Sequence, residues 1–435
     1  MKEDTRHFET ELAIVGSGIA GFAASIFALK RNIVTAQVGN TGAVAYTTGY
    51  LDLLGAIEQE PGAVDNPWEG IERLKKAHPD HPLCRTSAED IKNGFEQFTA
   101  FLGECGIAYT APQKSNITAL TPAGTLKKTL CVPATMAAGP EALAEKVPCV
   151  IIDFKGLKGF SARQVVANLK ETWPNVSAER IAFPGMDRGE IYPEVMARAL
   201  EVAATRQELA GLLKQAAGSA KVIGLPAVLG MHGPDMVRND LEQLTGLTIF
   251  EIPTMPPSVP GIRLREMFEQ VFPQKGITLI PQQKVASLTF DDDGAHLSLG
   301  DNYGPIIIHS RTVILATGRF LSGGLEAHIT GITESLLDLP VTQPTSRKDW
   351  YRDGYTDPLG HAIHKAGIEV DGSFRPLTRN GEPYNDRLFA AGIILGHQDW
   401  IRGRSGAGIA IATAYKAVQA AEKFLDTITL NRSER

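Results

Sequence analysis

The stretch that decides the fold is Glu11-Leu-Ala-Ile-Val-Gly-Ser-Gly-Ile-Ala-Gly21, followed by Phe22-Ala-Ala-Ser-Ile-Phe-Ala-Leu-Lys-Arg31. An apolar run, a GxGxxG motif and a helix-forming run follow one another directly, which is the order expected of a nucleotide-binding βα unit. Gly16 permits the tight turn, Gly18 lets a phosphate approach the backbone, and Gly21 lets the helix pack closely on the strand. The helix N-terminus then favours a phosphate. A glycine-rich turn that binds no ligand is the alternative.

The end of the next strand indicates which nucleotide is bound. A dinucleotide site usually places an Asp or Glu there to hold the adenosine ribose. The strand predicted at residues 32–38 instead continues into Gly39 and Asn40, and no acid follows before Asp52. That absence weakens an NAD interpretation. Asn40 can still hydrogen-bond a ribose, so FAD stays open.

Three later stretches carry a similar signal. Thr312-Val-Ile-Leu-Ala-Thr-Gly318 is an apolar strand ending in glycine, although alone it is equally well an ordinary buried strand. Arg387-Leu-Phe-Ala-Ala-Gly392 and Gly403-Arg-Ser-Gly-Ala-Gly408 precede a C-terminal helix, whose start would stabilise negative charge on a reduced flavin. Together the segments predict one discontinuous nucleotide domain. Its cofactor-binding candidates are Gly16, Ser17, Gly18, Ala20, Gly21, Asn40, Thr317, Gly318, Gly392, Ser405, Gly406 and Gly408.

Shorter elements are predicted around these segments. Residues 285–290 and 295–299 read as strands joined by Asp291-Asp-Asp-Gly294. This acidic tetrapeptide lacks the further oxygen ligands of a calcium loop, so a hairpin turn is predicted. A further strand is expected at residues 305–309, and a βα unit at residues 150–154 and 161–170.

Several stretches carry a resemblance that runs from one end of the chain to the other. They are residues 16–21, Thr47-Thr-Gly-Tyr-Leu-Asp-Leu-Leu54, Thr121-Pro-Ala-Gly-Thr-Leu126, Pro253-Thr-Met-Pro-Pro-Ser-Val-Pro-Gly-Ile-Arg-Leu264, Ala316-Thr-Gly-Arg-Phe-Leu-Ser-Gly-Gly-Leu325 and residues 388–395. In these stretches the sequence resembles the B subunit of the anaerobic glycerol-3-phosphate dehydrogenase, a flavoprotein family. The proline-rich segment and the Ser-Gly-Gly-Leu run are the most specific. The second stretch adds Thr48 and Gly49 to the cofactor-binding candidates.

The resemblance implies a flavin, usually FMN in this family, with FAD as the alternative. It also implies glycerol 3-phosphate as substrate, a dehydrogenase (A) subunit, and an iron–sulfur (C) subunit that docks at the membrane and passes electrons to quinone. The chain is then expected in the cytoplasm or peripherally on the inner face of the membrane. The sequence departs from the family at residues 397–400 and 404–408, which puts partner choice and substrate fit in question.

The expected fold class is α/β, with a discontinuous Rossmann-like flavin domain of the FAD/NAD(P)-binding type and a large inserted cap or substrate domain. The flavin domain is assigned to residues 1–56, 273–330 and 377–435. The insertion takes residues 57–272, and a short cap excursion takes residues 331–376.

Three residues are the catalytic candidates. Oxidation of a secondary alcohol needs a base for the hydroxyl proton, and His397 follows the Gly392 segment closely. A phosphorylated substrate needs cations, for which Arg263 and Arg402 are preferred because they lie in or near the family-like stretches. Each could equally be an ordinary surface or core residue. His361 and His364 have no third ligand in the sequence, so no metal site is predicted.

The composition of the chain excludes several classes of function. The 435 residues carry a formal net charge of −6 and have no long basic run, which argues against nucleic acid as a partner. Four scattered cysteines indicate a reduced protein with buried thiols. Residues 12–29 are uncharged, but their glycines and mixed flank argue against a transmembrane segment. Two other functions stay open: a flavin relay or scaffold subunit without substrate chemistry, and a stand-alone flavin oxidoreductase acting on another small acid or alcohol.

Overall fold

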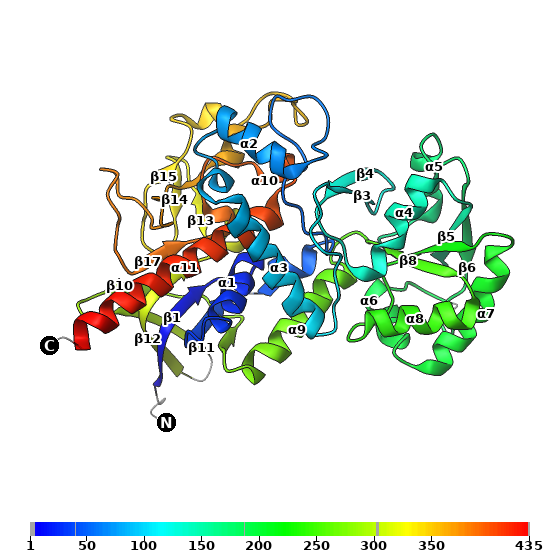
Figure 1. The fold of residues 1–435 in the computed structure, drawn as a ribbon, viewed down its shortest axis with the longest axis horizontal. Coiled ribbons are helices and arrows are strands. Elements are labelled where there is room, and N and C mark those ends of the chain that lie inside the picture. Colours follow the sequence, from blue (N-terminus) through cyan, green and yellow to red (C-terminus); the bar gives the residue numbers. More distant parts are fainter. Residues whose placement is uncertain (1–4, 40, 187, 302–303, 434–435) are drawn as a thin grey trace. The chain divides into compact units, whose positions relative to one another are not determined.

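The computed structural model describes residues 5–39, 41–186, 188–301 and 304–433. The chain forms two compact units, each with its own mainly parallel sheet (Figure 1). The first unit comprises residues 1–43, 52–98 and 268–435, and the second comprises residues 44–51 and 99–267. The expected α/β class is confirmed.

The first unit is organised on a sheet whose strand order is β10-β11-β12-β1-β2-β9, with β17 beside the carboxyl half of β12. The pairs β12–β1, β1–β2, β2–β9 and β12–β17 are parallel, so the carboxyl ends of these strands meet at one edge. Its strands are β1 (Arg6–Val15), β2 (Thr35–Gly39), β9 (Thr278–Pro281), β10 (Ser287–Phe290), β11 (Ala295–Asp301), β12 (Gly304–Leu315) and β17 (Leu388–Ala390).

The predicted hairpin is confirmed, because β10 and β11 pair antiparallel around residues 291–294. The strands expected at residues 305–309 and 312–318 form one strand instead. β12 follows β1 almost without interruption, from the Arg6–Ile306 pair to the Val15–Leu315 pair. Its amino half also pairs with β11 and its carboxyl half with β17, so one long strand serves two neighbours.

Helices and two short ribbons complete the first unit. The helices are α1 (Ile19–Leu29), α2 (Pro67–Ala77), α3 (Ala88–Glu104, which continues into the second unit), α10 (Trp400–Gly403) and α11 (Gly406–Ser433). The ribbons pair β13 (Leu325–Ala327) with β14 (Ile332–Glu334), and β15 (Val341–Thr342) with β16 (Gly367–Ile368). α1 packs on α11, where the rings of Phe27 and Tyr415 meet edge to face at 5.1 Å.

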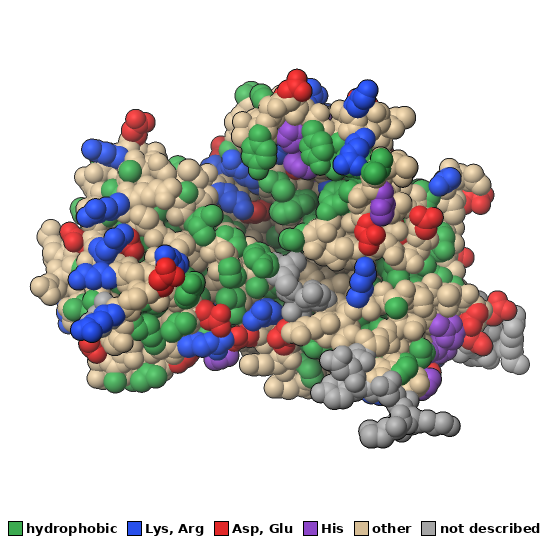
Figure 2. Space-filling model, turned by 180° about the vertical axis from the view of Figure 1, so that it is seen from behind, with side chains coloured by type: hydrophobic (Ala, Val, Ile, Leu, Met, Phe, Trp, Pro, Cys, Tyr) green, Lys and Arg blue, Asp and Glu red, His purple; other side chains and the backbone are tan. Residues whose placement is uncertain are grey.

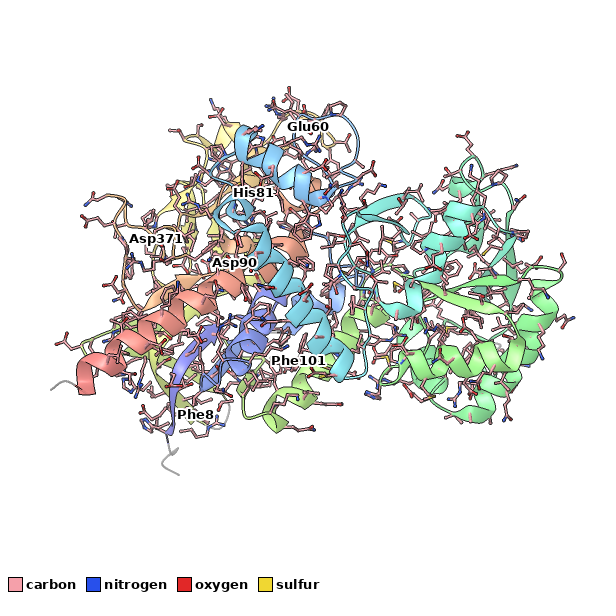
Figure 3. The ribbon with its side chains drawn as sticks, in the orientation of Figure 1. Phe8, Glu60, His81, Asp90, Phe101 and Asp371 are labelled. Atoms are coloured by element: carbon pink, nitrogen blue, oxygen red, sulfur yellow. The ribbon has the colours of Figure 1, made fainter. Side chains whose placement is uncertain are left out.

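The sequence places residues 57–98 in the insertion, but the structure groups residues 52–98 with the first unit. The reason is long-range packing against α11. A Cβ on Gly94 of α3 would lie 3.3 Å from Ile411, and Lys416 Nζ donates to Asp90 at 3.1 Å (Figure 3). Nothing local in the sequence of α3 reveals this packing.

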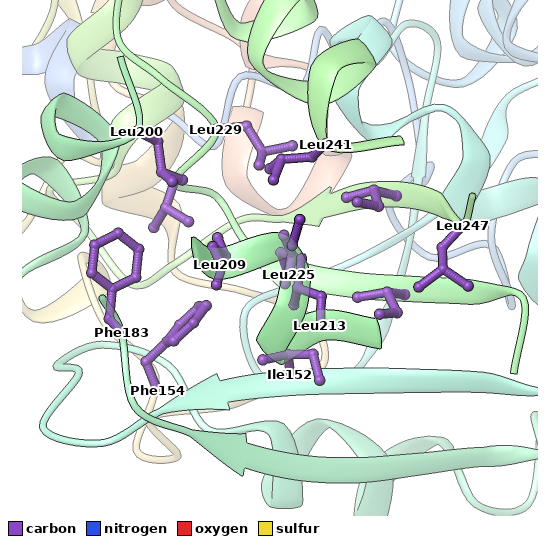
Figure 4. Close-up of a cluster of buried hydrophobic side chains, with 14 of the residues drawn as sticks. Ile152, Phe154, Phe183, Leu200, Leu209, Leu213, Leu225, Leu229, Leu241 and Leu247 are labelled. Atoms are coloured by element: carbon purple, nitrogen blue, oxygen red, sulfur yellow. The ribbon is translucent and has the colours of Figure 1, made fainter. Parts of the chain in front are cut away.

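The second unit contains a parallel sheet in the order β6-β5-β7-β8, which includes the predicted βα unit as β5 and α5. A cluster of buried side chains, including Phe154, Leu213 and Leu225, packs on the sheet (Figure 4). The elements are β3 (Ile117–Leu120), β4 (Leu126–Thr129), β5 (Cys149–Phe154), β6 (Val176–Ile181), β7 (Val222–Pro226), β8 (Thr248–Ile252), α4 (Ala138–Glu145), α5 (Ala162–Leu169), α6 (Pro193–Ala199), α7 (Ala203–Ala217), α8 (Pro234–Thr245) and α9 (Val259–Gln274, which continues into the first unit).

Other properties follow from the described residues. None of their helices is both long and apolar enough to cross a bilayer, and none of their His, Cys, Asp and Glu side chains form a metal-binding group of three or more. Burial raises the pKa of Cys131 and of Cys149 to about 12, so both thiols stay protonated at neutral pH. Figure 2 shows basic and acidic side chains interspersed on the face that it draws.

Candidate functional site

The candidate site is formed where three loops leave the carboxyl edge of the first unit's sheet. Gly16 N, at the end of β1, donates to Val38 O at 2.7 Å. Ala316 N, after β12, donates to Val15 O at 2.8 Å, and Ala391 N, after β17, donates to Leu315 O at 2.9 Å. Each loop therefore begins with a hydrogen bond to the neighbouring strand, which holds the three loops side by side.

Glycine is required where these loops meet. Gly16 has φ +131°, and a Cβ there would collide with Ala316 O. A Cβ on Gly21 would collide with Gly16 O, which gives the close strand–helix packing expected from the motif. Gly392 has φ +83°, and its Cβ would lie 2.6 Å from the Cβ of Ala20. Backbone from all three loops is thus packed around the start of α1.

Gly18 differs from these glycines. It is the N-cap of α1, with extended backbone angles, and a Cβ placed on it would meet no atom within 4 Å. Protein packing therefore does not require glycine at this position. A ligand phosphate that approaches the helix N-terminus would require it, since a side chain would occupy the same space.

Backbone contacts with Asp52 and Leu53 hold the start of α11 in place within the first unit. Gly408 N donates to Asp52 O at 2.6 Å, and a Cβ on Gly408 would lie 2.5 Å from Leu53 O. Thr413 Oγ1 accepts from Gly392 N at 2.8 Å, which joins this helix to the loop after β17. Gly406 packs against Trp400.

Whether a flavin fits here can be judged from three hydroxyl groups in these segments. The Oγ atoms of Ser17, Thr317 and Ser405 are buried and have no hydrogen-bond partner among the described residues. They come from the β1 loop, the β12 loop and the start of α11. Buried hydroxyls are normally paired, so these three orphans fit a ligand rich in oxygen and nitrogen acceptors. Ser17, Thr317 and Ser405, with the N-terminus of α1, would hold the flavin.

Arg319 ties two of the surrounding segments together. Its guanidinium donates to Leu395 O at 2.9 Å and to Gln398 O at 3.1 Å, and also to His364 O. The side chain is buried, and its Nε has no hydrogen-bond partner among the described residues. Burial lowers the pKa of Arg319 to about 10, with Asp399 opposing the shift. Arg319 remains a cation at neutral pH and fixes the loop that carries His397.

His397 and Arg402 lie in the segment after β17. His397 is half-buried, and its Nε2 lies 3.1 Å from Glu369 Oε1. Arg402 is exposed, and its guanidinium donates to Pro358 O. Both residues belong to the first unit. Their catalytic roles stay predictions.

Arg263 lies in the second unit, where its guanidinium is already engaged. It forms two parallel hydrogen bonds to Glu251, of 2.8 and 2.7 Å, and its Nε donates to Gly230 O at 2.8 Å. Both side chains of the pair are at most 2% exposed. Thr135 Oγ1 and Leu229 N also donate to Glu251. This network favours a structural role for Arg263, and its role at a substrate phosphate stays a prediction.

The remaining candidates are dispersed. Gly318 lies in the β12 loop with φ +69°, packed against Ser322. Thr48 and Gly49 belong to the second unit, where Tyr109 donates to Gly49 O at 2.8 Å. Asn40 lies outside the described residues. Sequence reasoning missed Glu251 and Glu369, the partners of two candidates. A lone carboxylate inside the apolar run of β8 was the available signal for Glu251.

The sheet and its three glycine-bearing loops define an α/β nucleotide-binding protein of Rossmann-like type. A model of the FAD binding domain family matches residues 11–409, and the chain belongs to that family. Its cofactor is accordingly a flavin.

Similar proteins extend over nearly the whole chain. The B subunit of the anaerobic glycerol-3-phosphate dehydrogenase of Aliivibrio fischeri is 28% identical over 429 residues, covering 93% of this chain and 94% of the relative. The protein of the same name from Vibrio vulnificus is 28% identical over 424 residues, covering 94% and 96%. A solved structure of 3-ketosteroid delta1-dehydrogenase from Sterolibacterium denitrificans aligns with a TM-score of 0.43 at 11% identity, covering 95% of this chain and 100% of that one.

Proposed function

We propose that this chain is the flavin-bearing B subunit of a glycerol-3-phosphate dehydrogenase, which oxidises glycerol 3-phosphate to dihydroxyacetone phosphate. The end-to-end similarity to relatives of that name supports the assignment. The observation that carries the flavin part is that the hydroxyls of Ser17, Thr317 and Ser405 are buried without a hydrogen-bond partner among the described residues, in the loops after β1 and β12 and at the start of α11. The proposed partners are a dehydrogenase (A) subunit, together with an iron–sulfur (C) subunit. Through them the chain would lie peripherally on the inner face of the membrane and pass electrons to quinone.

The residues of the first unit have distinct roles in this proposal. When bound, the flavin supplies the acceptor for a hydride from the substrate carbinol. The N-terminus of α1 holds its phosphate, and His397 takes the hydroxyl proton. Arg402, exposed beside this loop, is the proposed partner of the substrate phosphate.

The flavin is proposed to be FMN. The described end of β2 is apolar or glycine, with Val38 buried and Gly39 packed against Ser17, so no carboxylate there holds an adenosine ribose. The family's description favours FAD. We expect the flavin released by heat or acid to co-elute with FMN on reversed-phase chromatography, and co-elution with FAD would contradict this expectation.

The substrate is tested by the flavin's own colour. Glycerol 3-phosphate added without oxygen is expected to bleach the flavin absorbance of the purified holoprotein, while glycerol at equal concentration is expected to act far more slowly, because it lacks the dianion that Arg402 would bind. Equal rates of flavin reduction with the two compounds would show that the protein does not recognise the phosphate group.

One observation favours a second candidate, an electron-relay subunit without substrate chemistry. The guanidinium of Arg263 is occupied by Glu251, which leaves fewer cations for a substrate phosphate. In that case glycerol 3-phosphate bleaches the flavin only after the dehydrogenase partner is added. Bleaching of the isolated chain excludes the relay interpretation.

A further inference from the structure

The backbone around His397 is held in a conformation that non-glycine residues seldom adopt. Its φ is +61°, and its N–H donates to Lys365 O at 3.0 Å. The preceding Gly396 N donates to Ile368 O at 2.9 Å, and a Cβ on Gly367 would lie only 2.5 Å from Gly396 N. Histidine enters this region more readily than most residues, but it stays there only where neighbouring structure fixes it. The β15–β16 ribbon region provides that fixation.

The same region positions the His397 side chain. Its Nε2 lies 3.1 Å from Glu369 Oε1, and the same oxygen accepts a hydrogen bond of 2.8 Å from Thr342 Oγ1. The hydrogen bond from Thr342 lowers the pKa of Glu369; burial opposes this shift and His397 adds to it. Glu369 is therefore ionised at neutral pH. A carboxylate can only accept hydrogen bonds, so the neutral imidazole carries its proton on Nε2 and has a free lone pair on Nδ1.

We propose that Glu369 is a positioning residue that makes Nδ1 of His397 the proton acceptor for the substrate hydroxyl. This inference rests on the proposed function. The hydroxyl proton passes to Nδ1, the carbinol hydrogen leaves with two electrons as hydride to the flavin, and the C–O bond becomes C=O. Glu369 stabilises the imidazolium so formed and stays ionised, while the Nε2 proton remains on the ring, as expected of an orienting carboxylate.

The other titratable groups near this pair do not take over the role of Glu369 as the partner of His397. Burial, assisted by His78, His397 and Lys365, lowers the pKa of His81 to about 3, so His81 stays neutral. Lys365 forms an ion pair with Glu58 at 2.5 Å. Arg85 acts electrostatically on Glu369 and lowers its pKa, which reinforces the ionised state. Among the described carboxylates, Glu369 is the one that contacts the His397 ring.

The test uses Glu369→Gln, which keeps the shape and removes the charge, and Thr342→Val, which removes only the supporting hydroxyl. Glu9→Gln is the matched control, because Glu9 forms the same kind of pair with His309 at 2.8 Å near the amino end of β1. Flavin-loaded proteins are mixed anaerobically with glycerol 3-phosphate, and the rate of flavin reduction is followed against pH. In parallel, acylation of His397 by diethylpyrocarbonate is timed by peptide mass spectrometry.

In Glu369→Gln the limiting rate is expected to fall about tenfold. The acid limb of the pH profile should move to lower pH, because the imidazolium loses its carboxylate partner. For the same reason His397 should be acylated several-fold faster at pH 6. Thr342→Val should show smaller changes in the same directions, and Glu9→Gln should show neither change. A purely structural role would lower flavin content without moving the acid limb.

The negative outcomes separate two failures. If the unaltered protein alone is not reduced by glycerol 3-phosphate, the proposed substrate chemistry is wrong and the base role falls with it, and reduction only after the dehydrogenase partner is added would assign the relay role instead. If the unaltered protein is reduced but Glu369→Gln matches Glu9→Gln in pH profile and acylation rate, the positioning role alone is overturned.

Discussion

Replacing Arg263 by Met is expected to lower the free energy of unfolding of the second unit by about 3–5 kcal/mol. The substitution leaves the Glu251 carboxylate, which is fully buried, without its cation. A buried charge that loses its partner keeps the whole desolvation penalty. Trp173 is buried and is the one tryptophan in the sequence of this unit, so urea unfolding followed by tryptophan fluorescence measures the effect in a background where Trp68, Trp350 and Trp400 are replaced by Phe.

Two control variants separate charge from packing. Combining Arg263→Met with Glu251→Leu should recover much of the loss, since an apolar pair of similar volume removes the stranded charge. Lys158→Met is the matched surface control, because Lys158 and Glu190 form an exposed pair at 2.8 Å in the same unit. We expect no measurable shift for this control. An equally large loss in the double variant would show that the cost comes from the cavity and from the unpaired Thr135 hydroxyl, Leu229 N–H and Gly230 carbonyl, and not from the stranded charge.

The effect also has a defined pH dependence. Burial alone would raise the pKa of Glu251, but Arg263 and the hydrogen bonds to the carboxylate lower it overall. A folded-state pKa below the unfolded value means stability that is present at neutral pH and is lost as pH falls below the usual carboxyl range. Without Arg263 that contribution disappears, so the two proteins should differ most near pH 7 and less towards pH 4.

The same variant tests the predicted role of Arg263 at a substrate phosphate. If Arg263→Met unfolds at the urea concentration of the unaltered protein but needs far more glycerol 3-phosphate for flavin reduction, Arg263 binds substrate. The bidentate contact with Glu251 leads us to expect the reverse.

Sequence reasoning succeeded where function depends on local backbone. The collision expected at Gly21 is with Gly16 O, inside one strand–loop–helix unit, so the spacing of the motif was sufficient to predict it. It was insufficient for side-chain partners distant in the sequence. His397 meets Glu369 because Ile368 forms a bridge with Leu395, which places residue 369 beside the loop after β17.

Domain limits were missed for the same reason. The helix α3 has its own amphipathic pattern, and nothing in that pattern identifies α11 as its neighbour. The contact between Asp90 and Lys416 joins positions more than 300 residues apart. Such a contact depends on the completed sheet, which no local propensity encodes.

Replacing Gly18 by Val is expected to abolish flavin retention while the first unit stays folded. The backbone of Gly18 is extended, at φ −86° and ψ −176°, and a Cβ there meets no protein atom within 4 Å. Valine adopts these angles without strain, so the cost to folding is limited to a poorer N-cap, about 1 kcal/mol. A phosphate hydrogen-bonded to the start of α1 would approach to roughly 3 Å from the backbone nitrogens and leave no room for the side chain.

Two further glycines make this result specific. Gly21→Ala should lower both flavin content and stability, because its Cβ collides with Gly16 O. Gly211→Val on α7 also places its Cβ in open space, and it should change neither. The flavin-to-protein ratio of each purified variant, measured with its urea unfolding curve, distinguishes the three cases. A Gly18→Val protein that keeps its full flavin content would mean that the glycine motif is an ordinary strand–helix turn. The three orphan hydroxyls would then need another ligand.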